Sequence, residues 1–158
     1  MEGKVRVKLK SFDTLNSIIA LKLTNLGDLF LIPADRKVVV FGLPACSISH
    51  LPGFISKASE IKSKGVSEIY CLATNDAYVM SGWGRFTKSG DQVQMISDTD
   101  LKWLEPAGLT IDLSDHGLGT RANRFALIID DLKVTYVGVE KSAGDVSVSG
   151  ADAVLPKL

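Results

Sequence analysis

Residues 37–44 read Lys37-Val38-Val39-Val40-Phe41-Gly42-Leu43-Pro44, a continuous apolar run that ends at a proline. A strand with solvent on one face alternates apolar and polar residues, whereas a strand covered on both faces is apolar throughout. The run therefore predicts the central strand of a sheet that has helices on both sides. Cys46 follows it, just beyond the carboxyl end of that strand.

The segments after this strand alternate between helical and strand patterns. A helix is predicted over Ser47 to Lys64, and Pro52-Gly53 within it predicts a kink or a weak first half. Further expected elements are a buried strand at Glu68 to Ala73, a helix capped by Asn75-Asp76 that carries Tyr78, Val79, Trp83 and Phe86, and a third central strand at Val93 to Ile96. Of the aromatic residues on this helix, at least Phe86 is expected to pack in the core.

The two ends of the chain add strands and a short helix. Arg124 to Ile129 and Lys133 to Val139 flank Asp130-Asp131 and predict a hairpin, and a short helix is expected over Ser149 to Leu158. Near the amino terminus, strand candidates are Val5 to Leu9, Ile18 to Leu23 and Leu29 to Ile32. Strands that alternate with helices predict a three-layer α/β domain around a mixed sheet, and 158 residues favour one domain over residues 1–158.

Composition excludes several classes of function. The 18 basic and 18 acidic side chains cancel, which argues against nucleic-acid binding by bulk charge. Two cysteines and two histidines are too few for a disulfide scaffold or a cysteine-rich zinc site. No apolar run approaches the roughly 20 residues that span a bilayer, and the amino terminus does not resemble a secretory signal. We therefore expect an intracellular protein in a reducing compartment.

Cys46 is the residue with the clearest chemical potential. It is predicted to lie where a strand ends and a helix begins, and backbone N–H groups at a helix start stabilise a thiolate. The carboxyl ends of the strands are also where open α/β sheets place their sites. From this position alone, a reactive thiol and a small core residue are about equally supported.

The residues around Cys46 resemble a known family. Phe41-Gly42-Leu43-Pro44, Cys46-Ser47 and His50-Leu51-Pro52-Gly53-Phe54 resemble the active-site region of type II peroxiredoxins, the atypical two-cysteine, peroxiredoxin-five-like thiol peroxidases. The resemblance covers residues 36–158 and implies a thioredoxin-like (redoxin) fold with a central mixed sheet flanked by helices. It continues through Ile69 to Met80, Trp83, Leu118 to Arg121, Arg124 to Leu127, Asp130 to Val134 and Val139-Glu140.

The resemblance implies roles for four residues. Cys46 would be the peroxidatic cysteine, whose thiolate attacks the peroxide and becomes a sulfenic acid. Arg124 would stabilise the thiolate and the leaving oxygen, and Pro44 would begin the active-site loop and shield the thiolate from water. Cys71 would be the resolving cysteine, although a cysteine inside an apolar strand is also an ordinary core residue. Arg121 and His50 are expected to have supporting or packing roles.

One feature departs from the family. Only Ala45 separates Pro44 from Cys46, whereas the family has a longer loop with a threonine that hydrogen-bonds the thiolate and the peroxide. Two residues of chain reach at most about 7 Å, so the usual loop cannot form. Three interpretations stay open: an impaired relative, a re-registered helix start that keeps a working site, or a sequence from which loop residues are missing.

The resemblance implies a peroxidase that reduces hydrogen peroxide and alkyl hydroperoxides without a metal or organic cofactor. Thioredoxin, glutaredoxin or glutathione would supply electrons, and a homodimer is a further expected partner state, with no nucleic acid or membrane involved. The expected compartment is the cytoplasm, or an organelle if a transit peptide has been removed. The alternative is an impaired thioredoxin-fold relative that acts as a redox sensor or binding protein.

Overall fold

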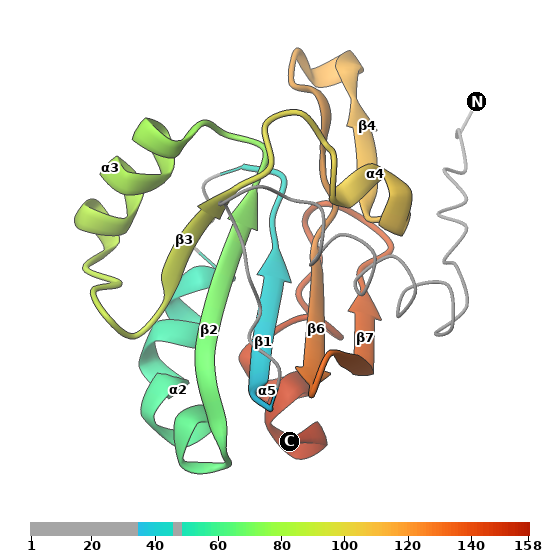
Figure 1. Cartoon of the computed structure of the whole chain (residues 1–158). Helices are drawn as coiled ribbons and strands as arrows, with labels where there is room; N and C mark the ends of the chain where they lie inside the picture. The colour runs from blue at the N-terminus through green and yellow to red at the C-terminus, as the bar shows by residue number, and fades with distance from the viewer. Residues whose placement is uncertain (1–34, 46–48) are drawn as a thin grey trace.

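The computed structural model describes residues 35–45 and 49–158 (Figure 1). The three strand candidates before residue 35 lie outside the described residues, as do Cys46 and Ser47. Within the described ranges, no helix is long and apolar enough to cross a membrane.

A five-stranded mixed sheet forms the centre of the fold, in the order β3-β2-β1-β6-β7. Strand β1 pairs in parallel with β2, and β2 pairs in parallel with β3, while β6 runs antiparallel to both β1 and β7. The strands are β1 (Lys37–Gly42), β2 (Val66–Ala73), β3 (Gln94–Ser97), β6 (Phe125–Asp130) and β7 (Lys133–Val139). The predicted central position of the 37–44 run and the predicted hairpin are confirmed.

The third predicted central strand is wrong in its position. Strand β3 lies at the edge of the described sheet, and none of its residues is fully buried. Of the predicted strand residues 93–96, Val93 is buried, but it precedes β3 and is not part of it. A short apolar run of this kind does not reveal whether the strand pairs with a neighbour on one side or on both.

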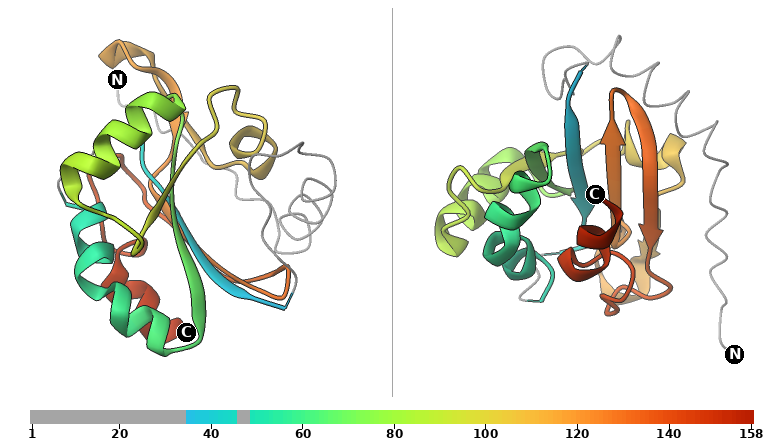
Figure 2. Two further views of the ribbon diagram at one scale, coloured as in Figure 1. Left: turned by 60° about the vertical axis from the view of Figure 1, so that its left-hand side comes forward. Right: turned by 90° about the horizontal axis from the view of Figure 1, so that it is seen from below.

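Helices cover both faces of the sheet (Figure 2). Helices α2, α3 and α5 cover one face, and α4 with a small two-stranded ribbon covers the other. The elements are α2 (Leu51–Ser63), α3 (Ala77–Thr87), α4 (Leu104–Ala107), α5 (Ala151–Val154), β4 (Thr110–Leu113) and β5 (Gly119–Ala122), with 3-10 turns at Ser114–His116 and Leu155–Lys157. The three-layer α/β class is confirmed, whereas α4, β4 and β5 were not predicted because such short elements carry little periodicity.

Alternation along β1 explains its continuous apolar sequence. Val39 and Phe41 belong to the core beneath α2 and α3, whereas Val38 and Val40 belong to the core beneath α4. Successive side chains of a strand point to opposite faces, so a strand between two helical layers must be apolar at every position. Each of these four side chains is fully buried.

Helix α2 begins later than predicted, at Leu51, with His50 at its N-cap. Pro52 therefore lies in the first turn, where its missing N–H has no helical partner to lose. The predicted kink is wrong for this reason, since the proline marks the start of the helix. The buried residues Leu51, Phe54, Ala58 and Ile61 match the predicted apolar face.

Helix α3 confirms one prediction and corrects another. The carboxylate of Asp76 accepts hydrogen bonds from the N–H groups of Tyr78 and Val79, so the predicted cap is present. Trp83 packs in the core, but Phe86 is 84% exposed, so the packing predicted for Phe86 is wrong. Tyr78 is also exposed, because the helix turns both rings away from the sheet.

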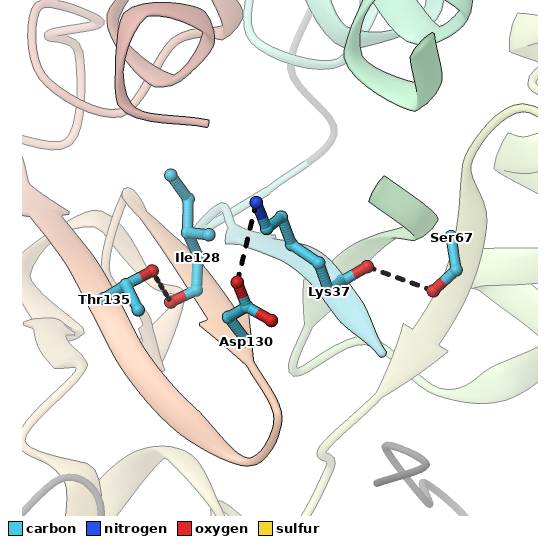
Figure 3. Close-up of polar contacts among 5 residues, drawn as sticks. All are labelled: Lys37, Ser67, Ile128, Asp130 and Thr135. Atoms are coloured by element: carbon cyan, nitrogen blue, oxygen red, sulfur yellow. Dashed lines mark hydrogen bonds and ion pairs between the residues drawn. The ribbon is translucent and has the colours of Figure 1, made fainter. Parts of the chain in front are cut away.

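Two β-bulges lie at the end of the sheet where β1 begins (Figure 3). Ser67 is the extra residue between β1 and β2, and its hydroxyl donates to the carbonyl of Lys37. Thr135 is the extra residue between β6 and β7, and its hydroxyl donates to the carbonyl of Ile128. Each bulged residue thus supplies a hydrogen bond where the regular ladder is interrupted.

Candidate active site

The carboxyl end of β1 brings together several residues that the sequence singled out. The N–H of Leu43 donates to the carbonyl of Leu72, which extends the pairing of β1 with β2 by one residue. Pro44 follows and is buried. Cys46 lies outside the described residues, and the described part of the site consists of groups at the carboxyl end of β1 and at the start of α2.

Arg124 lies at this same edge of the sheet. Phe125 pairs with Gly42, so Arg124 is one residue beyond the last pair of β6 with β1. Gly42 permits this approach, since a Cβ there would lie 2.1 Å from the ring of Phe125. Arg124 is only 6% exposed, and its Nε donates to the carbonyl of Ala143 over 3.0 Å.

Burial lowers the pKa of the Arg124 guanidinium, while the nearby carboxylate of Glu140 raises it. An arginine keeps its proton at physiological pH under such shifts, because its ordinary pKa is so high. The site therefore holds a fixed cation that is largely shielded from water.

His50 is buried at the start of α2. Its ring lies edge-on to Phe41 with the centroids 5.0 Å apart, and its Nε2 hydrogen-bonds the carbonyl of Ser149 over 2.8 Å. Burial and the charge of Arg124 lower the pKa of His50, whereas the hydrogen bond to Ser149 raises it. The net result is a pKa of about 4. The imidazole is therefore neutral at physiological pH with a proton on Nε2, which agrees with the packing role expected for it.

Residues 141–149, here called the 141–149 segment, follow β7 and contact both of these side chains. The carbonyl of Ala143 accepts from Arg124, and the carbonyl of Ser149 accepts from His50. At the base of the segment, the carboxylate of Glu140 accepts hydrogen bonds from Ser147, Val148 and Ser149.

Arg121 and Thr74 form a second polar contact at this edge. Arg121 Nη1 donates to the hydroxyl of Thr74 over 3.3 Å, and Arg121 Nε donates to the carbonyl of Leu118. Arg121 thus ties β5 to the end of β2, which fits the supporting role expected for it.

Cys71 lies in the core and not at the edge. It is fully buried in β2, paired with Phe41 of β1 and Met95 of β3. Its apolar cluster includes Phe54 of α2 and Trp83 of α3. A disulfide needs two Cα atoms within about 7 Å and space for both sulfurs, and the packed side chains around Cys71 leave its thiol no exposure to solvent.

Glu140, Ser149 and Thr74 were not identified as site residues from the sequence. Glu140 directly follows the predicted hairpin, and Ser147 and Ser149 are spaced to bind one carboxylate. Many carboxylates follow strands without such partners, so this signal becomes specific only when the loop geometry is known. A groove between α3 and β3 lies elsewhere, and none of Pro44, His50 and Arg124 lines it.

Comparison with known proteins identifies a matching family and similar sequences. The model of the redoxin family, described as "Redoxin", matches residues 20–155. Peroxiredoxin-2B of Arabidopsis thaliana is 47% identical over 130 residues, which cover 79% of this chain and 80% of that protein.

Solved structures show the same fold. Reduced Prx3 of Vibrio vulnificus in complex with hydrogen peroxide has a TM-score of 0.73 and 33% identity, covering 88% of this chain and 81% of that chain. Peroxiredoxin 5 of Alvinella pompejana has a TM-score of 0.68 and 26% identity, covering 78% and 79%. A thioredoxin-like sheet with a buried arginine beside the end of β1, in a sequence this similar to plant peroxiredoxins, places the chain in the redoxin family as a type II peroxiredoxin.

Proposed function

We propose that Cys46 and Arg124 carry the thiol peroxidase activity of this peroxiredoxin. The substrate is a peroxide, and the reductant is a thiol. The observation that supports the assignment is the buried guanidinium of Arg124, held by Ala143 at the edge where β1 leads to Cys46. The comparisons favour this function over that of a non-catalytic redox sensor or binding protein.

The reaction begins when the Cys46 thiolate attacks one oxygen of the peroxide. The S–O bond forms as the O–O bond breaks, and the leaving oxygen takes a proton and departs as water or an alcohol. Cysteine is thereby oxidised to a sulfenic acid while the peroxide is reduced by two electrons. A fixed cation stabilises both the initial thiolate and the negative charge that grows on the leaving oxygen.

Arg124 is suited to this role because it is oriented before the substrate arrives. Its Nε is occupied by the carbonyl of Ala143, and its burial keeps water from screening the charge. We propose that Pro44, buried between β1 and the cysteine, limits the access of water to the thiolate.

We propose that Cys71 resolves the sulfenic acid. Its thiol would condense with Cys46–SOH to form a disulfide and release water, and an external dithiol or two glutathiones would then reduce the disulfide. Since Cys71 is fully buried beneath α2, this step requires local opening of the helix start. Thioredoxin, glutaredoxin and glutathione are the candidate donors.

Two further features remain predictions. A homodimer would explain the exposed rings of Tyr78 and Phe86 on α3, because large apolar side chains in water favour a protein contact. Light scattering of the wild type and of a Tyr78→Ser/Phe86→Ser variant would test this, with a dimer expected only for the wild type.

The compartment is expected to be the cytoplasm, or an organelle if a targeting peptide has been removed.

The test of the function is peroxide consumption by the purified chain in the presence of excess dithiothreitol. Wild type is expected to turn over, Cys46→Ser is expected to be inactive, and mass spectrometry with a sulfenic-acid trap is expected to label Cys46. Turnover that survives in Cys46→Ser would disprove the assignment. Cys71→Ser is the control for resolution: a mapped Cys46–Cys71 disulfide supports its role, whereas only hyperoxidised Cys46 in peroxide-treated wild type contradicts it.

A further inference from the structure

The carboxylate of Glu140 is buried and fully engaged in hydrogen bonds. Glu140 is 3% exposed. Its Oε1 accepts from the N–H groups of Ser147, Val148 and Ser149 and from the hydroxyl of Ser149, and its Oε2 accepts from the hydroxyl of Ser147, at 2.6 to 2.8 Å. All five donors come from three consecutive residues, so a single side chain fixes one end of the 141–149 segment.

That segment carries both carbonyl groups that hold the buried polar side chains of the site. Ala143 accepts from Arg124 Nε over 3.0 Å, and Ser149 accepts from His50 Nε2 over 2.8 Å. The first contact orients the cation next to the end of β1, and the second holds the residue at the N-cap of α2. One segment therefore contacts both Arg124, next to the carboxyl end of β1, and His50, at the start of α2.

Glu140 is itself tied to the sheet. Its N–H donates to the carbonyl of Arg124 over 2.9 Å, so the carboxylate projects from a fixed backbone position. Val148 approaches β7 closely: its carbonyl accepts from the Tyr136 hydroxyl over 2.7 Å, and a Cβ on Gly138 would lie 2.1 Å from that oxygen. The segment therefore has little freedom to move while these contacts persist.

We propose that Glu140 is a positioning residue for the peroxidase site, which acts by anchoring the 141–149 segment so that Ala143 and Ser149 hold Arg124 and His50 in place. The proposal rests on the proposed function, since it assigns a purpose to the position of Arg124 at the end of β1. Glu140 touches neither the peroxide nor the thiol in this mechanism.

The chemistry of the carboxylate suits an anchor. Burial alone raises the pKa of the Glu140 carboxyl, but the hydrogen bonds from Ser147, Ser149 and Val148 outweigh burial and lower the pKa to about 2. The group is therefore ionised at every pH at which the enzyme works, and hydrogen bonds to a charged acceptor are stronger than neutral ones. The same negative charge favours a protonated Arg124.

Three variants test the proposal. Glu140→Ala removes the anchor and leaves the donors without their acceptor. Glu140→Gln keeps one oxygen for the three N–H groups, and its amide can donate to the Ser147 hydroxyl, so it removes the charge but retains most of the anchor. Glu60→Gln makes the same chemical change on the exposed face of α2 and is the matched control.

The first measurement is independent of catalysis. Nitrogen-15 NMR of the Arg124 Nε–H and the His50 Nε2–H reports whether both protons stay protected from exchange with water. We expect protection in the wild type, Glu140→Gln and Glu60→Gln, and loss of protection at both sites in folded Glu140→Ala. Protection that persists at both sites in Glu140→Ala overturns the anchoring role.

The second measurement follows the thiol. Alkylation of Cys46 against pH, located by peptide mapping, gives its pKa, and the rate constant with hydrogen peroxide is measured on the same samples. Glu140→Ala is expected to raise the thiol pKa and to slow the reaction by about tenfold or more, with Glu140→Gln within about threefold of wild type. If Glu140→Ala loses the exchange protection of Arg124 and His50 but keeps the Cys46 pKa and the rate with hydrogen peroxide, the positioning role is wrong. Glu140 would then only stabilise the loop.

A destabilised control separates positioning from general loss of stability. Ile129→Val removes one methylene from the core at the far end of β6 from Arg124, and we expect it to keep the wild-type thiol pKa and rate. Equal effects in Ile129→Val and Glu140→Ala would contradict the proposal. A wild type that consumes no peroxide would instead refute the proposed function, while the NMR result would still decide whether Glu140 positions Arg124 and His50.

Discussion

The backbone N–H of Glu140 donates to the carbonyl oxygen of Arg124 over 2.9 Å, one residue beyond the last pair of β6 and β7. Arg124, a cation, precedes β6, and Glu140, an anion, follows β7. The two charged residues therefore lie next to each other at the open end of the hairpin. The anion binds the 141–149 segment, and that segment returns to bind the cation through Ala143. The hairpin end therefore supplies both the proposed catalytic charge and the group that holds it.

Replacement of Arg124 by lysine should impair catalysis although the charge is retained. The planar guanidinium donates from Nε to Ala143 and can present its other N–H groups to the substrate at the same time. Lysine has no such group. We expect Arg124→Lys to slow the reaction with hydrogen peroxide about a hundredfold, as the loss of an oriented donor to a developing anion does. Stopped-flow measurement of peroxide consumption checks this.

Arg85→Lys is the matched control for that experiment. Arg85 is exposed on α3 and hydrogen-bonds Ser81 one turn earlier. Its replacement should leave the rate constant at the wild-type value. Equal rates in Arg124→Lys and wild type would show that the orientation of the guanidinium is unimportant.

Buried His50 should make stability depend on pH between 6.5 and 4. Its pKa is about 4 in the folded protein and 6.5 ordinarily, so below pH 6.5 the unfolded chain binds a proton that the folded chain does not. The stability is present above pH 6.5 and falls as the pH approaches 4, by about 3 kcal/mol. Urea unfolding of the wild type and His50→Gln across this range measures it, and parallel curves would contradict the assignment.

Glu140 should make stability depend on pH in a lower range. Its pKa is about 2 in the folded protein and 4.5 ordinarily, so the stabilisation is complete above pH 4.5 and is lost as the pH falls towards 2. The loss is about 3 kcal/mol. Glu140→Gln cannot titrate, so its unfolding free energy should change less than that of the wild type below pH 4.5. An equally steep acid transition in both proteins would assign the loss to other carboxylates.

Gly138→Ala should destabilise the protein through the 141–149 segment. The new Cβ would lie 2.1 Å from the carbonyl oxygen of Val148, which is backbone and can move only with its segment. We expect a loss of roughly 1 to 3 kcal/mol in urea unfolding. Gly82→Ala is the control: nothing lies within 4 Å of its Cβ position in α3, so alanine should stabilise the helix by roughly 0.5 to 1 kcal/mol. Gly138→Ala at wild-type stability would show that the segment adjusts freely.

The sequence predicted the elements whose signals are local. The continuous run of β1 predicted a central strand because two covering layers require apolar residues on both faces. The cap of α3 was predicted because Asp76 contacts N–H groups only two and three residues away. Phe86 was misplaced since its helical position alone does not reveal how far the apolar face extends.

Family resemblance, carried by motifs around Pro44, Cys46 and Arg124, was enough to indicate the class of the protein. Only the tertiary structure showed that Glu140, Ala143 and Ser149 belong with them. The bond between His50 and Ser149 joins residues 99 positions apart, and no periodicity or spacing rule reports contacts at that separation. Caps and buried strands depend on residues close together in the sequence, so the sequence alone predicts them. The position of a buried charge depends on distant backbone groups that only the tertiary fold brings near it.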